Sequence, residues 1–228
     1  MNWRSIIHVC ERSVVFKYEN VVLKVSDSDR IQREYNNLRQ LPKRSYIQPT
    51  DGMEILKLTN DQDKLCREIN DDFPPDVKLL CLWLPYIDGI KLFELVYDSF
   101  YDLETIMVKK YITFCRQIYH LNTTDKLFHN DLHPNNIFYT DNGFVAIDFE
   151  DLTEGIPDNI EGYSNDFEQV MVYLKDLIRR WIRDDKNIKN LFTINNIYSD
   201  NFPNKLDSLN LNDIDFLTRV ENIIADVE

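Results

Sequence analysis

Residues 127–151 read LFHNDLHPNNIFYTDNGFVAIDFED, and the fold of the chain depends on this stretch. It contains two apolar runs, at 137–139 and 144–147, with Asp141-Asn142-Gly143 between them. The Asn-Gly pair tolerates the positive φ that a tight hairpin turn requires. The pattern therefore predicts a β-hairpin whose outer ends are rich in oxygen-bearing side chains.

Three of these side chains stand at the outer ends of the expected hairpin. Asp131 and Asn136 come just before the first strand, and Asp148 comes just after the second. A hairpin brings its two outer ends side by side, so we expect the three side chains to converge. Carboxylate and amide oxygens are ligands that suit Mg²⁺. The sequence thus predicts a magnesium site at this end of the hairpin.

The order HNDLHPNN and then IDFED resembles the catalytic and metal-binding loops of the protein-kinase-like superfamily. The general pattern there is His-x-Asp, a short gap, Asn, and then Asp-Phe-Gly. Two details, His133 in place of lysine and Glu150 in place of the last glycine, are closer to aminoglycoside phosphotransferases, choline kinases and some atypical protein kinases. The resemblance implies an α+β, bilobal fold. A small lobe with an antiparallel sheet and one helix would span 1–87, and a mainly helical lobe 88–228.

The resemblance also implies roles for these residues. Asp131 would be the catalytic residue that orients an incoming hydroxyl and accepts its proton. Asn136 and Asp148 would hold Mg²⁺ on the phosphates of ATP, so ATP and Mg²⁺ are the expected cofactors. His129 would support the loop backbone. His133 would contact Asp148 or the acceptor.

Alternating apolar residues near the N-terminus predict three short strands, at 5–9, 13–18 and 21–25. Ser and Asp side chains that can cap a helix follow, and a helix is expected from Arg30 to Leu41, ended by Pro42. This part of the chain would form the start of the small lobe.

Lys24 resembles the strand lysine that pairs with the α- and β-phosphates, and Glu34 resembles the helix glutamate that pairs with this lysine. The glycine-rich loop of the family would fall on His8, Cys10 and Ser13, and no glycine stands there. Backbone amides of this loop can still approach phosphates, but without the close cradle that glycines allow.

A continuous apolar run at 79–84 predicts a buried central strand, and the lobe boundary is expected within 85–89. Tyr86 and Ile87 resemble the linker between lobes, whose backbone hydrogen-bonds to adenine, so both are expected to bind the cofactor.

Elements in the rest of the chain are predicted mainly from the spacing of its apolar residues. Residues 54–58 fit a strand, and a polar stretch follows up to Pro74-Pro75. Apolar residues at helical spacing predict helices around 103–121, 167–181 and 214–227 that pack into a core. Asp166, at the start of the second of these, resembles the acid that anchors the catalytic loop backbone in kinases.

The composition of the chain limits the kinds of molecule that it can be expected to bind. The chain has 228 residues, a net charge of -13, 43% hydrophobic residues and 12% aromatic residues, which is typical of a globular protein. This charge argues against nucleic acid and anionic membranes as partners and favours a cationic acceptor. The four cysteines are widely spaced, as in reduced thiols. No signal peptide or membrane-spanning stretch is evident, so a soluble protein in the cytosol of its own or a host cell is expected.

Two other kinds of site fit the motif less well. His129 and His133 have the spacing of a zinc protease helix, but Asn130 replaces its glutamate and Pro134 opposes a helix. A glycosidase pair would explain the two aspartates but neither Asn136 nor Lys24.

The sequence leaves three functions open. The first is an ATP-dependent kinase of minimal size that acts on a serine or threonine of a protein, favoured by the short region after the motif. The second is a kinase of a small alcohol of the aminoglycoside or choline type. The third is a pseudokinase that serves as a binding module, which the missing glycines favour and the retained acidic and lysine side chains oppose.

Overall fold

The computed structural model of the chain describes residues 5–10, 12–98, 101–155, 165–184, 188–190, 192 and 214–225. These divide into two compact units. The first comprises Met1–Asp88 and the short segment Asp148–Leu152, and the second comprises Gly89–Ile147 and Thr153–Glu228. That the units correspond to kinase-like lobes stays a prediction.

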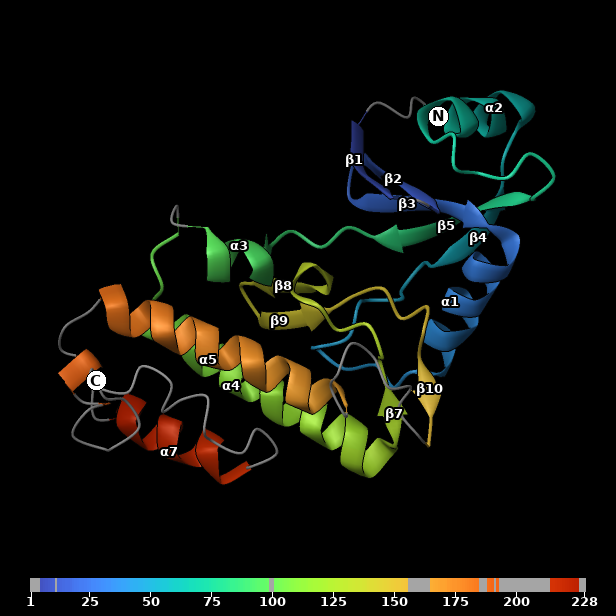
Figure 1. The fold of residues 1–228 in the computed structure, drawn as a ribbon. Coiled ribbons are helices and arrows are strands. Elements are labelled where there is room, and N and C mark those ends of the chain that lie inside the picture. Colours follow the sequence, from blue (N-terminus) through green and yellow to red (C-terminus); the bar gives the residue numbers. More distant parts are fainter. Residues whose placement is uncertain are drawn as a thin grey trace. The chain divides into compact units, whose positions relative to one another are not determined.

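The first unit contains a five-stranded antiparallel sheet (Figure 1). In spatial order its strands are β1 (Ser5–Cys10), β2 (Ser13–Tyr18), β3 (Val21–Asp27), β5 (Leu79–Pro85) and β4 (Glu54–Lys57). The strands expected from the sequence are all confirmed.

Two helices accompany this sheet. The expected one, α1 (Ser28–Gln40), begins where the Asp27 side chain accepts hydrogen bonds from two backbone amides, and its C-cap is Leu41. The other, α2 (Asn60–Ile69), lies in the polar stretch for which no helix was predicted. Its local signal is a capping box, in which Thr59 and Gln62 each bind the other's backbone amide with their side chains.

The two faces of the sheet have different surroundings. Leu23 and Val25 on β3 belong to a hydrophobic cluster that includes Cys66 of α2. Successive strand residues point to opposite faces, so Lys24 lies on the other face of the sheet, where it meets α1. The rest of this cluster is Val14, Phe16, Phe73, Leu79 and Cys81.

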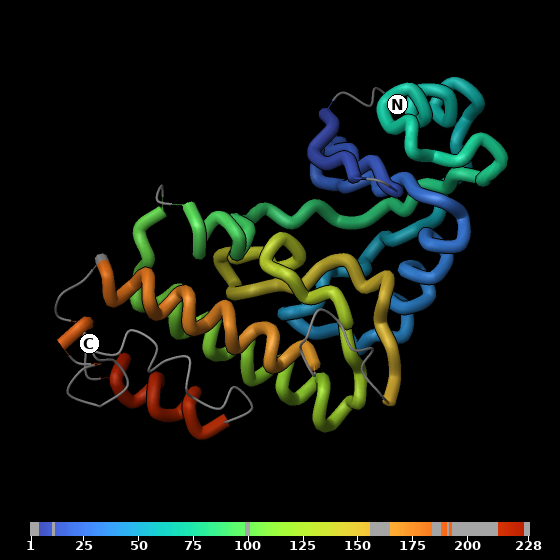
Figure 2. Tube along the Cα trace, in the orientation of Figure 1, coloured from blue at the N-terminus to red at the C-terminus, as the bar shows by residue number. Residues whose placement is uncertain are grey.

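The second unit contains the predicted hairpin, and Figure 2 shows its trace. Its strands are β8 (Ile137–Thr140) and β9 (Gly143–Ala146), with β6 (Ile90–Lys91) added to β8. The short strands β7 (Leu127–Phe128) and β10 (Thr153–Glu154) form a separate antiparallel pair. The hairpin expected from the Asn-Gly turn is confirmed.

The described helices of this unit are α3 (Leu92–Tyr97), α4 (Thr105–His120), α5 (Asp166–Asp184) and α7 (Ile214–Ala225). A π-helical turn, Leu121–Asp125, continues α4, and a 3-10 turn, Pro134–Asn136, precedes β8. The helix α4 begins after Leu103, which was expected inside it. Helices α4 and α5 lie side by side in both ribbon and tube views.

The core of this unit joins the hairpin to the helices. The Tyr111 ring on α4 meets the Phe144 ring of β9 edge-on, with 4.8 Å between centroids. The buried Tyr111 hydroxyl donates a hydrogen bond to the Val170 carbonyl of α5, 3.1 Å away.

The chain is therefore an α+β protein with an antiparallel sheet in its N-terminal part and helices in its C-terminal part. No helix among the described residues combines the length and the apolar character that crossing a bilayer requires.

Candidate active site

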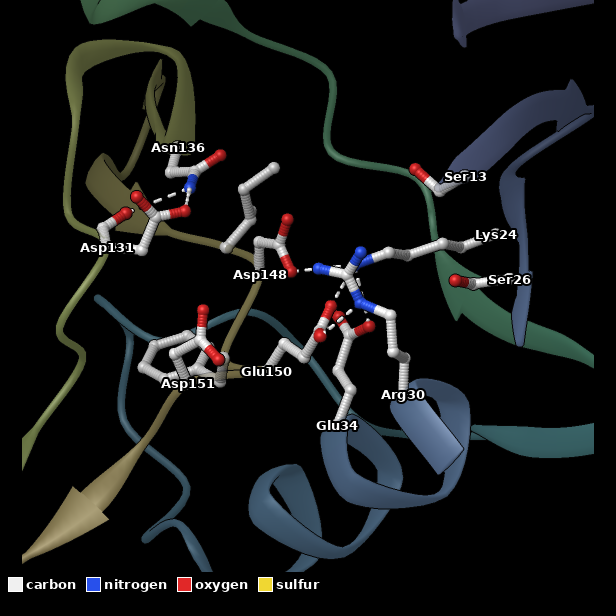
Figure 3. A network of polar contacts seen from close by, with 12 residues as sticks. Ser13, Lys24, Ser26, Arg30, Glu34, Asp131, Asn136, Asp148, Glu150 and Asp151 are labelled. Carbon is white, nitrogen blue, oxygen red and sulfur yellow. Dashed lines mark hydrogen bonds and ion pairs between the residues drawn. The ribbon is translucent and has the colours of Figure 1, made fainter. Parts of the chain in front are cut away.

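Lys24 is the centre of a buried charge cluster in the first unit (Figure 3). Its Nζ lies 2.8 Å from Glu34 Oε2 and 2.7 Å from Asp148 Oδ1. The side chains of Lys24 and Glu34 are 11% and 2% exposed. The ion pair between strand lysine and helix glutamate that the resemblance implies is thus present, and Asp148 shares the same lysine.

Burial and mutual attraction shift the pKa values in this cluster. Burial raises the pKa of Glu34 to about 7, and the positive charge of Lys24 only partly opposes this effect. Burial alone would lower the pKa of Lys24. The charges of Glu34 and Asp148 outweigh it, so the pKa of Lys24 is raised and the ammonium stays charged at neutral pH.

The segment that follows Asp148 is tied to α1. The Arg30 guanidinium donates a hydrogen bond to Glu150 Oε1, and Glu150 Oε2 lies 3.9 Å from Lys24 Nζ. The Asn37 amide donates to the carbonyls of Phe149, at 2.8 Å, and Glu150, at 2.9 Å. Arg30 and Asn37 were not expected at this site. The signal for them is their seven-residue spacing on one face of α1.

Tyr86, which the resemblance places in the linker between lobes, is held by the turn between β2 and β3. Its backbone amide donates to the Asn20 carbonyl at 2.8 Å, and Lys17 Nζ lies 3.5 Å from the centroid of its ring. Ile87, the next residue, is half-buried. The Tyr86 amide is thus already engaged within the protein.

In the second unit, Asp166 fixes the backbone of the loop that carries Asp131. Its carboxylate accepts hydrogen bonds from the amides of His129, at 2.7 Å, and Asn130, at 2.9 Å. Asn122 Nδ2, on the π-helical turn, donates to the same carboxylate at 3.0 Å. This is the anchoring contact implied by the resemblance. The contribution of Asn122 was not foreseen, because a π-helical turn has no clear sequence signal.

Asp131 and Asn136 lie together at the start of the hairpin (Figure 3). Asn136 Nδ2 donates to the Asp131 carbonyl at 2.9 Å and to its carboxylate at 3.2 Å. The amide oxygen of Asn136 takes no part in these two bonds and is the atom that could ligate a cation. His133 Nε2 lies 3.7 Å from Asp131 Oδ2, and His133 Nδ1 accepts from the Asn135 amide.

His129 supports the loop backbone, as expected. Its Nδ1 accepts a hydrogen bond from the Asp131 amide at 3.3 Å, so its Nε2 carries the proton and donates to the Ile147 carbonyl at 2.7 Å. Both ring nitrogens are engaged by the backbone, which leaves no nitrogen for a zinc ion.

The turn between β1 and β2 is the segment on which the resemblance would place a glycine-rich loop. Cys10 Sγ lies 3.0 Å from Ser13 Oγ, and Ser26 Oγ donates to the Arg12 carbonyl at 2.6 Å. One contact joins the ends of β1 and β2 to each other, and the other joins the turn between them to β3.

The predicted residues form two groups. Lys24, Glu34 and Asp148 meet in the first unit, and Asp131 and Asn136 meet in the second. Within the described ranges, no three or more His, Cys, Asp or Glu side chains form a cluster that could hold a metal by themselves. Mg²⁺ does not need such a cluster, because it is commonly bound by one or two carboxylates together with substrate phosphates.

Comparison with known proteins gave no relative: neither a scan against protein-family models nor a search of curated proteins found a match.

Proposed function

We propose that the chain is an ATP-dependent phosphotransferase of the protein-kinase-like type, which moves the γ-phosphate of ATP to a hydroxyl. The observation that carries the proposal is the position of Lys24 between Glu34 and Asp148. A buried lysine held between a helix carboxylate and a carboxylate just after the hairpin is the arrangement that the kinase-like pattern requires for nucleotide phosphates.

The donor set of the first unit fits a nucleotide with Mg²⁺. Lys24 supplies a fixed positive charge for phosphate oxygens, and Asp148, with its side chain 35% exposed, supplies a carboxylate that solvent reaches. The kinase-like pattern assigns the second ligand to Asn136, whose amide oxygen takes no part in its two bonds to Asp131. When bound, Mg²⁺ would neutralise negative charge on the transferring phosphoryl group.

Asp131 is the proposed catalytic residue. Its side chain is 43% exposed, so the carboxylate can be reached by an incoming hydroxyl and receive its proton. The backbone around it is fixed from both sides, by the Asp166 carboxylate and by the His129 ring. Such fixation matters because phosphoryl transfer depends mostly on positioning and on electrostatic stabilisation.

The base of the nucleotide would be read by the linker backbone. Because the Tyr86 amide already binds the Asn20 carbonyl, the Ile87 amide is the donor that we assign to the adenine ring. Tyr86 then acts by keeping the linker in place, through its amide and through the Lys17 ammonium on its ring.

The acceptor that we propose is a serine or threonine hydroxyl of a protein. The net charge of -13 favours a basic partner surface. The same charge favours an amino alcohol or aminoglycoside, so this class is the alternative that the experiment must separate.

The test is transfer of labelled γ-phosphate by the purified protein in the presence of Mg²⁺. A basic generic protein and a panel of amino alcohols and aminoglycosides serve as separate acceptors. We expect label on protein, abolished by Asp131→Asn and by Asp148→Asn, with Asp141→Asn in the hairpin turn as the control that retains activity. Label on a small molecule would contradict the protein acceptor and support the amino alcohol or aminoglycoside class. Binding of Mg-ATP without transfer to any acceptor would favour the pseudokinase.

A further inference from the structure

One face of α1 carries four polar side chains at helical spacing, all with partners in the first unit. Positions three, four and seven residues apart lie on the same face of a helix. The four are Arg30, Arg33, Glu34 and Asn37. Glu34 binds Lys24, and the other three all bind the segment Asp148–Leu152.

The two arginines on this face differ in burial. Arg30 pairs with Glu150, whose side chain is only 7% exposed. Arg33 pairs with Asp151 at 3.8 Å, and both of these side chains are more than half exposed, at 53% and 51%. Exposed pairs contribute little, whereas a buried carboxylate that loses its partner is costly. The Arg30–Glu150 pair is therefore the one that can fix the segment.

Asp148 itself needs such fixation. Its φ is 64°, in the left-handed region that residues other than glycine rarely adopt. A conformation of this kind persists only when the surrounding structure holds it. The next two residues are held firmly, because Asn37 binds the carbonyls of Phe149 and Glu150 and Arg30 binds the Glu150 side chain.

From these contacts we infer that Arg30, Asn37 and Glu150 are positioning residues. They form a latch, defined as the Arg30–Glu150 ion pair with the Asn37 amide, that keeps Asp148 permanently in its metal-binding conformation. The inference rests on the proposed function for the identity of the ligand, a nucleotide with Mg²⁺.

The latch explains how Asp148 can be in place without a prior activating change of conformation. Glu150 stands where the kinase pattern has a glycine, a residue whose conformational freedom permits a loop to change its path. Here the same position carries a buried charged side chain that is tied to α1. A change in the path of the segment Asp148–Leu152 would therefore leave both Arg30 and Glu150 without their partner charge. Activation by phosphorylation or by a partner is thus not required for Asp148 to be in place.

The experiment compares the full-length wild type with Arg30→Gln, the double variant Arg30→Gln/Glu150→Gln, and Arg33→Gln as the matched control. Calorimetry measures the affinity for a non-hydrolysable ATP analogue with and without MgCl₂. Hydrogen–deuterium exchange of the peptide that covers 148–152 measures the fixation of the segment without any ligand.

We expect Arg30→Gln and the double variant to lose about tenfold or more of the Mg²⁺-dependent affinity, as metal sites do when a group that orients a ligand is removed. Their affinity without Mg²⁺ should not change, and Arg33→Gln should behave as the wild type. The double variant should regain thermal stability lost in Arg30→Gln, because Glu150 no longer carries an unpaired charge, while its Mg²⁺-dependent affinity stays low. A purely structural pair would restore both together.

Exchange at 148–152 should be faster in Arg30→Gln than in the wild type and in Arg33→Gln. If Arg30→Gln shows the same exchange at 148–152 as the wild type, or the same Mg²⁺-dependent affinity, the inference that the latch positions Asp148 is wrong. If the wild type binds no Mg-nucleotide at all, the proposed function fails, and exchange alone then decides whether Arg30 fixes Asp148.

Discussion

Lys24 Nζ lies 2.7 Å from Asp148 Oδ1, although the two residues are 124 positions apart in the chain. The contact joins β3 to the residue that follows the hairpin, and it makes Glu34 and Asp148 share a single positive charge. Loss of that charge has consequences for stability and for ligand binding.

Replacing Lys24 with methionine should destabilise the protein by about 3 kcal/mol at about pH 8, because it leaves Glu34 buried and without its partner charge. Urea unfolding measures this loss. Lys57→Met, at the exposed end of β4, is the matched control and should change stability little. Equal effects of the two substitutions would show that the buried pair is not important for stability.

Stability should depend on pH through Glu34. Burial raises its pKa from 4.5 to about 7, so between these values the folded protein binds the proton more tightly than the unfolded chain does. Its contribution to stability is therefore complete below pH 4.5 and is lost as the pH rises through about 7. The loss amounts to about 3 kcal/mol.

The comparison with Glu34→Gln isolates this effect, because glutamine has a similar shape and does not titrate. The unfolding free energy of the wild type, taken relative to that of the variant, should fall between about pH 5 and about pH 8. A difference that is flat with pH, or that rises, would contradict the raised pKa.

Asp166→Asn should weaken the loop that carries Asp131. The carboxylate of Asp166 accepts two backbone amides and the Asn122 amide, and asparagine would place a donor among these donors. We expect a loss of about 2–3 kcal/mol in thermal or urea unfolding. Glu168→Gln, in the same first turn of α5, is the control for the helix dipole and should cost less than about 1 kcal/mol.

Gly89 should not tolerate alanine. A Cβ there would stand 2.4 Å from the Tyr139 carbonyl oxygen, so the backbone next to β6 would have to move away from β8. We expect a loss of about 1–3 kcal/mol. Asp88→Ala, at the exposed neighbouring position, should be nearly neutral. Unfolding curves for Gly89→Ala that match the wild type would rule out this close approach.

Much of the fold could be predicted because its signals are local. The Asn-Gly turn at Asn142 and Gly143 predicted the hairpin, and alternating apolar residues predicted β2 and β3. The helix α2 was missed because the stretch is polar and its apolar face is narrow: Cys66 is its one fully buried residue. The capping box at Thr59 and Gln62 was the only strong sign of that helix.

The site was less predictable where it depends on contacts between distant segments. The motif predicts Asp131, Asn136 and Asp148 as site residues. The arrangement of Arg30 and Asn37 around Glu150 instead follows from the packing of α1 on a segment more than a hundred residues later. Periodicity shows which residues share a helix face, not what that face meets. Asn122 was missed because it lies on a π-helical turn without a clear sequence signal, and its contact with Asp166 joins positions 44 residues apart.

The most direct test of the account is calorimetric titration of the wild type with a non-hydrolysable ATP analogue, with and without Mg²⁺, beside Asp148→Asn and the exposed control Asp151→Asn. The account predicts that Mg²⁺ strengthens binding to the wild type and to Asp151→Asn, and that Asp148→Asn loses this increment. No binding to the wild type, or a Mg²⁺ effect that Asp148→Asn retains in full, would contradict the assignment of Lys24, Glu34 and Asp148 to a nucleotide site.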